Sequence, residues 1–198
     1  KVIDSVDTAS QQAPPGPDGE YSTAARRQDE AYEQINSSDD EVFHTYLYDW
    51  YLSQEKFDRL LEIESPYIVT YLRRKADTSA RDAELLCRYY ARHYSFFEAA
   101  TVQLQLAKSG FDLSLQERIE YLSRAKTNAS TRLTGMADIR LSRLSRQELT
   151  REVSDLLDVA NIQEDIVSRL QEDPRASPER RAELVKELSG QVLPIQTV

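Results

Sequence analysis

Glycine is scarce along this chain, and this scarcity limits the possible folds more than any other feature. Only 5 of the 198 residues are glycine, whereas average usage would give roughly 14. Glycine-rich phosphate loops, Rossmann turns and tight β-hairpins need residues at positive φ, where glycine is favoured. The sequence therefore argues against nucleotide-binding α/β folds and all-β folds alike.

Charge and size exclude further classes. The composition is typical of a globular domain, and no run approaches the ~18 apolar residues of a membrane span. The net charge of −9 makes the chain a poor general ligand for phosphate backbones, so nucleic-acid binding is not expected. The single cysteine, Cys87, excludes an internal disulfide framework and a cysteine-based zinc site, and it fits a reducing compartment. The chain starts at Lys1 without a methionine or signal pattern, which favours a segment of a longer protein.

Two regions differ in composition. Residues 1–19 are predicted to be a flexible linker or the end of a preceding helix, because the stretch 11–19 is rich in proline and glycine. Residues 20–198 carry helical signals throughout. A serine followed three residues later by an acid is typical of a capping box at a helix start. This pattern occurs at Ser38/Glu41, Ser95/Glu98, Ser114/Glu117, Ser145/Glu148 and, in a weaker form, Ser79/Asp82.

Other residues also mark helix ends. Ser65-Pro66 and Ser177-Pro178 place a capping serine before a proline at the first helical position. Gly110 and Gly190 are predicted to stop the helices that precede them. The predicted helices span residues 20–36, 39–53, 55–63, 66–76, 80–93, 96–109, 115–131, 146–172 and 178–189, with a further candidate around 137–143.

Apolar spacing between these signals is helical. The stripes are Ala83, Leu86, Tyr90 and Tyr94; then Phe97, Ala100, Leu104 and Ala107, with Val102 and Leu106 on a second face; then Leu115, Ile119, Leu122 and Ala125. Helices that are apolar on two faces need neighbours on both sides, which suits a stacked array better than a closed bundle. Short connections favour antiparallel neighbours, and no fixed-period repeat is present. The predicted fold is all-α, an irregular α-solenoid of stacked antiparallel helices.

The predicted helix 146–172 is the longest. Its near-heptad apolar positions are interrupted by Gln163, which argues against a coiled coil. We expect a solenoid helix that packs across several others.

Catalytic constellations are not evident. His44 and His93 are the only histidines and belong to no metal-ligand motif, so structural or surface roles are expected. Cys87 and His93 cannot form a catalytic Cys–His pair. They are six residues apart on one helix, so they are rotated by ~240° about the helix axis and separated by ~9 Å along it. The acids Asp39, Asp40 and Glu41 sit at a helix N-terminus, where they favour the dipole. No catalytic, cofactor-binding or metal site is predicted, and the chain is not expected to be an enzyme.

Aromatic side chains gather in three places. They are Phe43, Tyr46, Tyr48, Trp50 and Tyr51; Tyr67 and Tyr71; and Tyr89, Tyr90, Tyr94, Phe96 and Phe97. Inter-helix core is the first interpretation, because aromatics dominate core energetics. A groove that captures a peptide is the alternative, because the same side chains are favoured as binding hot spots.

Charge is also uneven. Six acids and no base lie between Asp29 and Glu41. Seven bases lie between Arg124 and Arg151, against only Asp138 and Glu148: Arg124, Lys126, Arg132, Arg140, Arg143, Arg146 and Arg151. These stretches are either solvated surface or electrostatic contacts, the basic one for an acidic partner or a neighbouring subunit.

Seven runs along the chain carry a family resemblance. They are Phe43–Leu52 (FHTYLYDWYL), Leu60–Tyr67 (LLEIESPY), Tyr71–Ala76 (YLRRKA), Leu86–Tyr90 (LCRYY), Ser95–Ala100 (SFFEAA), Ser114–Leu122 (SLQERIEYL) and Val159–Gln163 (VANIQ). In this order and spacing they resemble the large inner-ring scaffold nucleoporins, and the resemblance covers residues 40–172. The stretch 128–146 and the tail after Pro174 match poorly.

The resemblance implies a piece of the C-terminal α-solenoid, without the N-terminal β-propeller of that family. It implies a location in the nuclear pore complex, at the nuclear envelope, and a scaffold role in nucleocytoplasmic transport. The implied partners are linear segments of linker nucleoporins and adjacent scaffold subunits, with membrane proximity only through the propeller. No partner-contact residue can be transferred to a numbered position. A vesicle-coat or tethering solenoid remains the alternative, because fold alone does not separate these functions.

Overall fold

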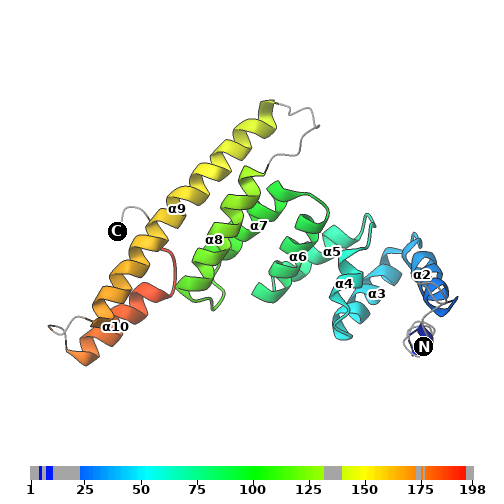
Figure 1. The fold of residues 1–198 in the computed structure, drawn as a ribbon, viewed down its shortest axis with the longest axis horizontal. Helices are drawn as coiled ribbons and strands as arrows, with labels where there is room; N and C mark the ends of the chain where they lie inside the picture. The colour runs from blue at the N-terminus through cyan, green and yellow to red at the C-terminus, as the bar shows by residue number, and fades with distance from the viewer. Residues whose placement is uncertain are drawn as a thin grey trace, which may run out of the picture. The chain divides into compact units, whose positions relative to one another are not determined.

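The structure is a computed structural model that describes residues 5, 8–10, 23–131, 140–172, 175 and 177–194. Among these residues there are helices and connections but no strand. The helices are α2 (Thr23–Asn36), α3 (Glu41–Ser53), α4 (Phe57–Leu61), α5 (Ile68–Ala76), α6 (Ala80–Arg92), α7 (Phe96–Lys108), α8 (Leu115–Ser130), α9 (Arg140–Glu172) and α10 (Pro178–Ser189) (Figure 1). The all-α prediction is confirmed. Of the segment 1–19, predicted as a linker or the end of a preceding helix, Ser5 and residues 8–10 are helical and the remaining residues lie outside the described ones.

The chain divides into two compact units, residues 1–71 and residues 72–198. The core of the N-terminal unit combines tyrosine rings with aliphatic side chains. Tyr48 and Tyr51 of α3 are fully buried, and the ring of Tyr32 from α2 stacks on Tyr51 at 6.0 Å between centroids. Tyr71 packs edge-on against Tyr48, and its hydroxyl donates a hydrogen bond of 2.7 Å to Asp49. The core of the unit consists of these rings and the buried aliphatic residues Leu47, Leu60, Leu61, Ile63 and Ile68.

The C-terminal unit is a stack in which each helix packs on the next, from α6 through α7, α8 and α9 to α10 (Figure 1). Helix α7 has two buried faces, as the sequence predicted. Its Ala100, Leu104 and Ala107 join a core with α8 and α9, whereas Leu106 joins a second core with Ala83 and Cys87 of α6. A helix buried on both sides is what a solenoid requires and what a closed bundle does not.

Helix α9 corrects two predictions. The structure has one helix over Arg140–Glu172 in place of separate helices at 137–143 and 146–172. Residues 137–139 lie outside the described residues. Ser145 and Glu148 therefore lie inside this helix and do not form a capping box. The predicted packing of α9 across several helices is confirmed, because it contacts α7, α8 and α10.

The other predicted caps are only partly confirmed. Ser114 and Glu117 form the predicted capping box of α8, and Ser79 and Ser177 cap α6 and α10. Asp40, not Ser38, caps α3: its carboxylate accepts hydrogen bonds from the N–H groups of Val42 and Phe43. Ser95 precedes α7 without a side-chain cap. After Ser65-Pro66 the chain makes a turn, and α5 begins only at Ile68.

Two helices end in left-handed residues that are not glycine. Glu55 follows α3 with φ of 54°, and Tyr94 follows α6 with φ of 57°. The N–H of Ser95 bonds to the carbonyl of Tyr90 at 2.8 Å and that of Tyr94 bonds to Ala91 at 3.2 Å. These two bonds define a Schellman motif, whose left-handed position usually holds glycine. Tyr94 was predicted to continue the apolar stripe of α6, but its ring is 68% exposed.

A buried arginine shapes the turn between α7 and α8. Arg118 is 1% exposed, and its guanidinium donates hydrogen bonds to four backbone carbonyls. Nη1 bonds to Ala107 at 2.9 Å and to Ser109 at 2.8 Å. Nη2 bonds to Phe111 at 2.9 Å, and Nε bonds to Leu113 at 3.3 Å. The pKa of Arg118 is lowered by burial. The positively charged guanidinium therefore lies at the C-terminal end of α7, where backbone carbonyls have no donor within the helix.

Gln163 has a comparable role between α9 and α10. This side chain, 1% exposed, is the residue that interrupts the apolar pattern of α9. Its Nε2 donates to the carbonyls of Leu188 and, at 2.7 Å, of Gln191. Its Oε1 accepts from the N–H of Leu193 at 3.0 Å. The amide therefore holds the end of α10 and the residues after it against α9.

We predict that Arg118→Met destabilises the protein by about 3–5 kcal/mol, because the carbonyls of Ala107, Ser109 and Leu113 lose this donor and that of Phe111 keeps only the N–H of Leu113. Urea unfolding followed by circular dichroism measures the change. The control is Arg124→Met on the same helix, where the side chain is partly exposed and the expected loss is below about 1 kcal/mol. Equal losses for the two variants would contradict this role of Arg118.

We predict that Tyr94→Gly raises stability by about 0.5–1 kcal/mol, because glycine adopts the left-handed conformation without the cost paid by other residues. The exposed ring contributes little burial that would be lost. Thermal unfolding by calorimetry measures the effect. Arg92→Gly, inside the last turn of α6, serves as the opposite control and lowers stability by roughly 1 kcal/mol.

We predict that Gln163→Met loosens α10 without unfolding the rest of the stack. Three backbone groups at and after the end of α10 lose their partners, so amide exchange of residues 178–193 accelerates by about tenfold or more. Hydrogen exchange with mass spectrometry locates the change. Gln147→Met on the exposed side of α9 is the matched control, and unchanged exchange in the Gln163 variant would refute the assignment.

Candidate partner-binding surfaces

The residues considered for catalysis lie apart and have structural roles. His44 is fully buried in the N-terminal unit, with Nε2 2.5 Å from the carbonyl oxygen of Ser38. His93 is the C-cap of α6, and its ring lies 4.2 Å from that of Tyr89. Cys87 lies in the α6–α7 core, and burial followed by the charge of Glu84 raises its pKa to about 12. A thiol with this pKa is protonated and unreactive near neutral pH.

The described part of the chain lacks two further features. No group of three or more histidine, cysteine, aspartate or glutamate side chains within it is placed to hold a metal ion. No helix within it is both long and apolar enough to cross a membrane.

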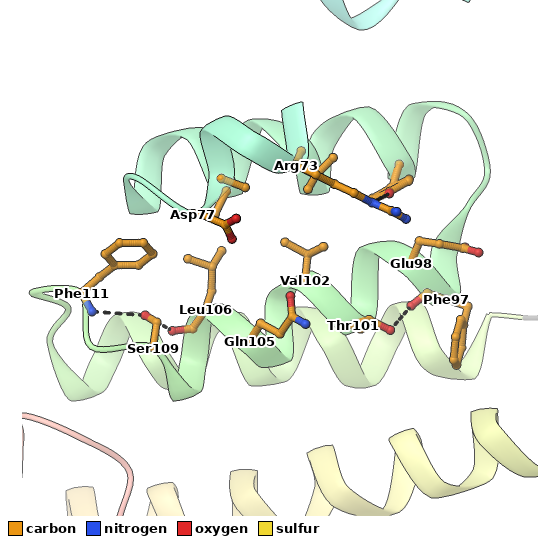
Figure 2. A pocket seen from close by; sticks show the side chains of 14 residues that line it. Arg73, Asp77, Phe97, Glu98, Thr101, Val102, Gln105, Leu106, Ser109 and Phe111 are labelled. Atoms are coloured by element: carbon orange, nitrogen blue, oxygen red, sulfur yellow. Dashed lines mark hydrogen bonds between the residues drawn. The ribbon is translucent and has the colours of Figure 1, made fainter. Parts of the chain in front are cut away.

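A groove of about 700 Å³ lies between α7 and the pair α5–α6 in the C-terminal unit (Figure 2). Val102 and Leu106 of α7 face it from one side, and Leu86 and Tyr90 of α6 line it as well. Phe97 and Phe111 lie toward its two ends. Helical rise makes the α7 wall roughly 18 Å long between residues 97 and 109, which matches about five or six residues of extended peptide.

Polar side chains surround the apolar part of this groove, which we call the α6–α7 groove. Asp77 and Glu98 line different parts of the groove, and the side chain of Gln105 points toward the groove from a position between these two carboxylates (Figure 2). Arg73 reaches along the rim, where its Nε donates to the hydroxyl of Tyr90 at 2.9 Å. An apolar surface with a few polar groups fixed in position is typical of a ligand-binding cleft.

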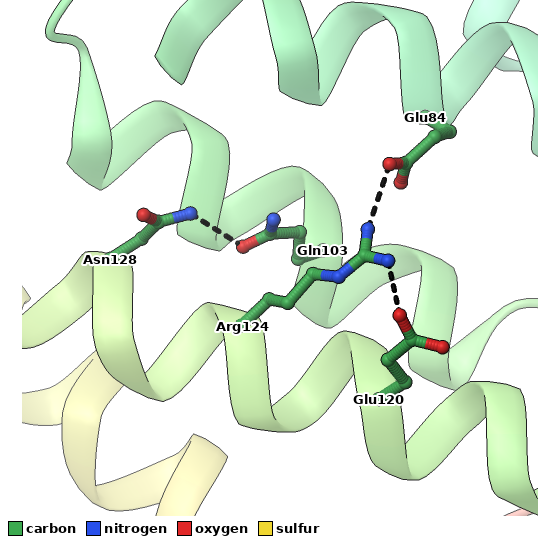
Figure 3. A network of polar contacts seen from close by, with 5 residues as sticks. All are labelled: Glu84, Gln103, Glu120, Arg124 and Asn128. Carbon is green, nitrogen blue, oxygen red and sulfur yellow. Dashed lines mark hydrogen bonds and ion pairs between the residues drawn. The ribbon is translucent and has the colours of Figure 1, made fainter.

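A polar network supports the helices behind the groove (Figure 3). Arg124 of α8 pairs with Glu84 of α6 at 2.8 Å and with Glu120 one turn away. Asn128 of α8 donates to the buried amide oxygen of Gln103 on α7 at 2.9 Å. These bonds tie α6, α7 and α8 together and hold the groove on a rigid base.

Several arginines of the basic stretch 124–151 bond to other residues of the same chain. Arg124 is engaged with Glu84 and Glu120, and Arg146 donates to the carbonyl of Thr131 at 3.0 Å. Arg151 lies 3.9 Å from Asp155, while Arg132 lies outside the described residues. This stretch therefore does not form one continuous basic surface from the side chains that can be placed.

The aromatic clusters separate into core and surface. Tyr48, Tyr51, Tyr71, Tyr89 and Tyr90 are buried, as the core interpretation predicted. Tyr46 is 72% exposed and Phe43 is 40% exposed, and Val42 beside them on α3 is 64% exposed. On α3 the buried residues His44, Leu47, Tyr48 and Tyr51 follow the i, i+3, i+4, i+7 spacing of one helix face, and Tyr46 lies off that face. The helical period was therefore a signal that could have separated the two groups on this helix.

Comparison with known proteins supplies the family. The family described as Nucleoporin_C, non-repetitive/WGA-negative nucleoporin C-terminal, matches residues 1–197. Nucleoporin NUP170 of Chaetomium thermophilum is 46% identical over the whole chain, and NUP170 of Saccharomyces cerevisiae is 38% identical over 82% of it. The chain spans only 13% and 10% of the length of these two relatives.

Solved structures agree with the sequence match. The Chaetomium thermophilum Nup170 C-terminal domain in complex with Nup145N aligns with 99% of this chain at a TM-score of 0.86 and 44% identity. The chain covers 38% of that structure. The same domain without this partner aligns at a TM-score of 0.82. The predicted α-solenoid fold is confirmed by this likeness, and the chain belongs to the Nucleoporin_C family of non-repetitive nucleoporin C-terminal domains.

Proposed function

We propose that this chain is a structural scaffold segment of the nuclear pore complex inner ring and supports nucleocytoplasmic transport without catalysing a reaction. Its relatives are nucleoporins, which favours this role over a vesicle-coat or tethering solenoid. The stacked helices supply a stiff support, because each layer is buried against the next. The proposed location is the nuclear pore complex at the nuclear envelope.

We further propose that the segment receives an extended peptide of a linker nucleoporin. The observation that carries this proposal is the likeness to a Nup170 domain whose structure contains Nup145N. On this chain, the α6–α7 groove is the surface best shaped for such a segment. Its apolar residues can hold one or two side chains, and Gln105 and the rim carboxylates can bond the peptide backbone or its polar groups.

The groove is suited to a linear segment for an energetic reason. A disordered segment loses conformational entropy when it binds, so the receiving surface must be preorganised to leave net affinity. The α6 and α7 walls of the groove are fixed by buried side chains and by the Arg124 and Asn128 contacts to α8, so these walls need little ordering when a peptide binds. Neighbouring scaffold subunits are the second class of partner that we propose.

Calorimetric titration with segments of linker nucleoporins equivalent to Nup145N tests the proposal. We expect saturable 1:1 binding that Val102→Glu weakens by about tenfold or more, because a carboxylate enters the apolar part of the groove. Gln105→Arg is a second variant at an exposed position, which keeps the test informative if Val102→Glu disturbs folding.

The matched control is Val42→Glu, the same substitution at an exposed position of α3 in the other unit. Binding that survives Val42→Glu but not the two groove variants supports the assignment. Binding that survives every groove variant means that the peptide sits elsewhere. If no linker segment binds at all, the proposed receptor function is wrong for this segment.

A further inference from the structure

The α2–α3 pair in the N-terminal unit carries a second surface with different chemistry. Val42, Phe43 and Tyr46 expose large apolar area on α3, where an isolated surface helix would place polar residues. Beside them a hollow of about 480 Å³ opens between the two helices. It is lined by Ala31, Gln34 and Ile35 of α2, by Ser38 and Asp40 of the connection, and by Phe43.

Negative charge predominates around this hollow. Between Arg27 and Lys56 the sequence has carboxylates but no lysine or arginine. Two bases from further along the chain reach α2, where Arg59 pairs with Asp29 at 3.3 Å and Lys56 donates to the hydroxyl of Tyr32 at 3.4 Å. Asp39 and Glu41 lie next to the exposed apolar residues and are themselves exposed, and Glu30 and Glu33 lie on the exposed side of α2. Asp40 accepts the hydrogen bonds of the α3 N-terminus and also lines the hollow.

Helix capping explains only part of this charge. One carboxylate satisfies the orphan N–H groups of α3, and acids in the first turn favour the helix dipole. Asp39 precedes the cap, and the acids of α2 lie away from its N-terminal turn. Their mutual repulsion is reduced when positive charge is brought near, and apolar side chains beside them gain by leaving water.

We propose that this surface docks a lysine- or arginine-rich segment of another protein that inserts an aliphatic side chain between α2 and α3. The apolar hollow supplies an anchor, with Phe43 as one wall and Tyr46 beside it. The carboxylates attract the basic residues that flank the anchor, which raises the association rate and rejects acidic segments. This docking surface lies in the other unit from the α6–α7 groove and is independent of the proposed linker site.

Chemical-shift mapping on the ¹⁵N-labelled chain tests the proposal, because it detects weak binding and locates it. The probe is a synthetic peptide of about 14 residues, a helix or strand long enough to cross α2 and α3, rich in lysine and carrying two leucines four residues apart. We expect saturable shifts confined to α2, α3 and their connection. Two matched probes, with the leucines changed to serine or the lysines to glutamate, are expected to bind at least tenfold more weakly.

Variants of the protein separate the two components of the surface. Tyr46→Ala removes exposed apolar area, and we expect it to weaken binding several-fold at all salt concentrations. The pair Asp39→Asn and Glu41→Gln is expected to weaken binding mainly at low salt and to flatten its salt dependence. Tyr94→Ala is the control, because Tyr94 is equally exposed but lies in the C-terminal unit.

Three results would overturn the proposal. The first is shifts scattered over acidic positions of α9 as well, which would indicate nonspecific attraction to a negatively charged chain. The second is equal binding of the leucine and serine probes. The third is no saturable binding, together with concentration-dependent sedimentation of the free protein that Tyr46→Ala abolishes, which would assign the surface to contact between copies of this chain.

Discussion

The guanidinium of Arg118 is the interaction on which the C-terminal stack most depends. Where α7 ends and the chain turns into α8, several backbone carbonyls point into the interior and no helix can satisfy them. One side chain donates to four of them and is itself almost completely removed from water. Burial of a charge is unfavourable unless hydrogen bonds compensate it, so the turn and the arginine are stable only together.

The geometry of this turn determines what lies on both sides of it. It directs α8 back along α7, so that Ala100, Leu104 and Ala107 meet Leu122 and Ala125. The opposite face of α7 remains for α6, and Val102 and Leu106 then form one wall of the α6–α7 groove. The Arg124 and Asn128 contacts also join helices through polar groups, but they lie nearer the surface. They connect α8 to α6 and to α7, in addition to the apolar contacts between the helices.

The cores of the two units differ in the side chains that form them. The C-terminal unit packs small and aliphatic side chains, which allow close helix approach and long, regular layers. The N-terminal unit adds packed tyrosine rings and a buried histidine to its buried leucines and isoleucines. The difference has a consequence for surface chemistry, because α3 has aromatic residues on more than one side and only some of them can be interior.

Helix signals were most reliable where a local interaction decides the structure. Ser114 and Glu117 form their capping box because both partners lie within one turn, and the Glu117 pKa is lowered by those hydrogen bonds with Ser114. Ser145 and Glu148 show the same spacing but lie inside α9, since the helix already begins at Arg140 and packing continues it. The glycine shortage was also informative, although Glu55 and Tyr94 show that left-handed helix ends occur here without glycine.

The sequence by itself determined the helical class, most helix positions, the two apolar faces of α7 and, through the ordered runs of residues 40–172, the family. These depend on periodicity and on neighbours within a few residues. Only the tertiary structure decided that the buried side chains of Arg118 and Gln163 hold helix ends through hydrogen bonds, and that Arg73, Asp77 and Gln105 line one groove. Such roles depend on how separate helices rotate against one another, and that rotation results from packing summed over many contacts, which no local pattern encodes.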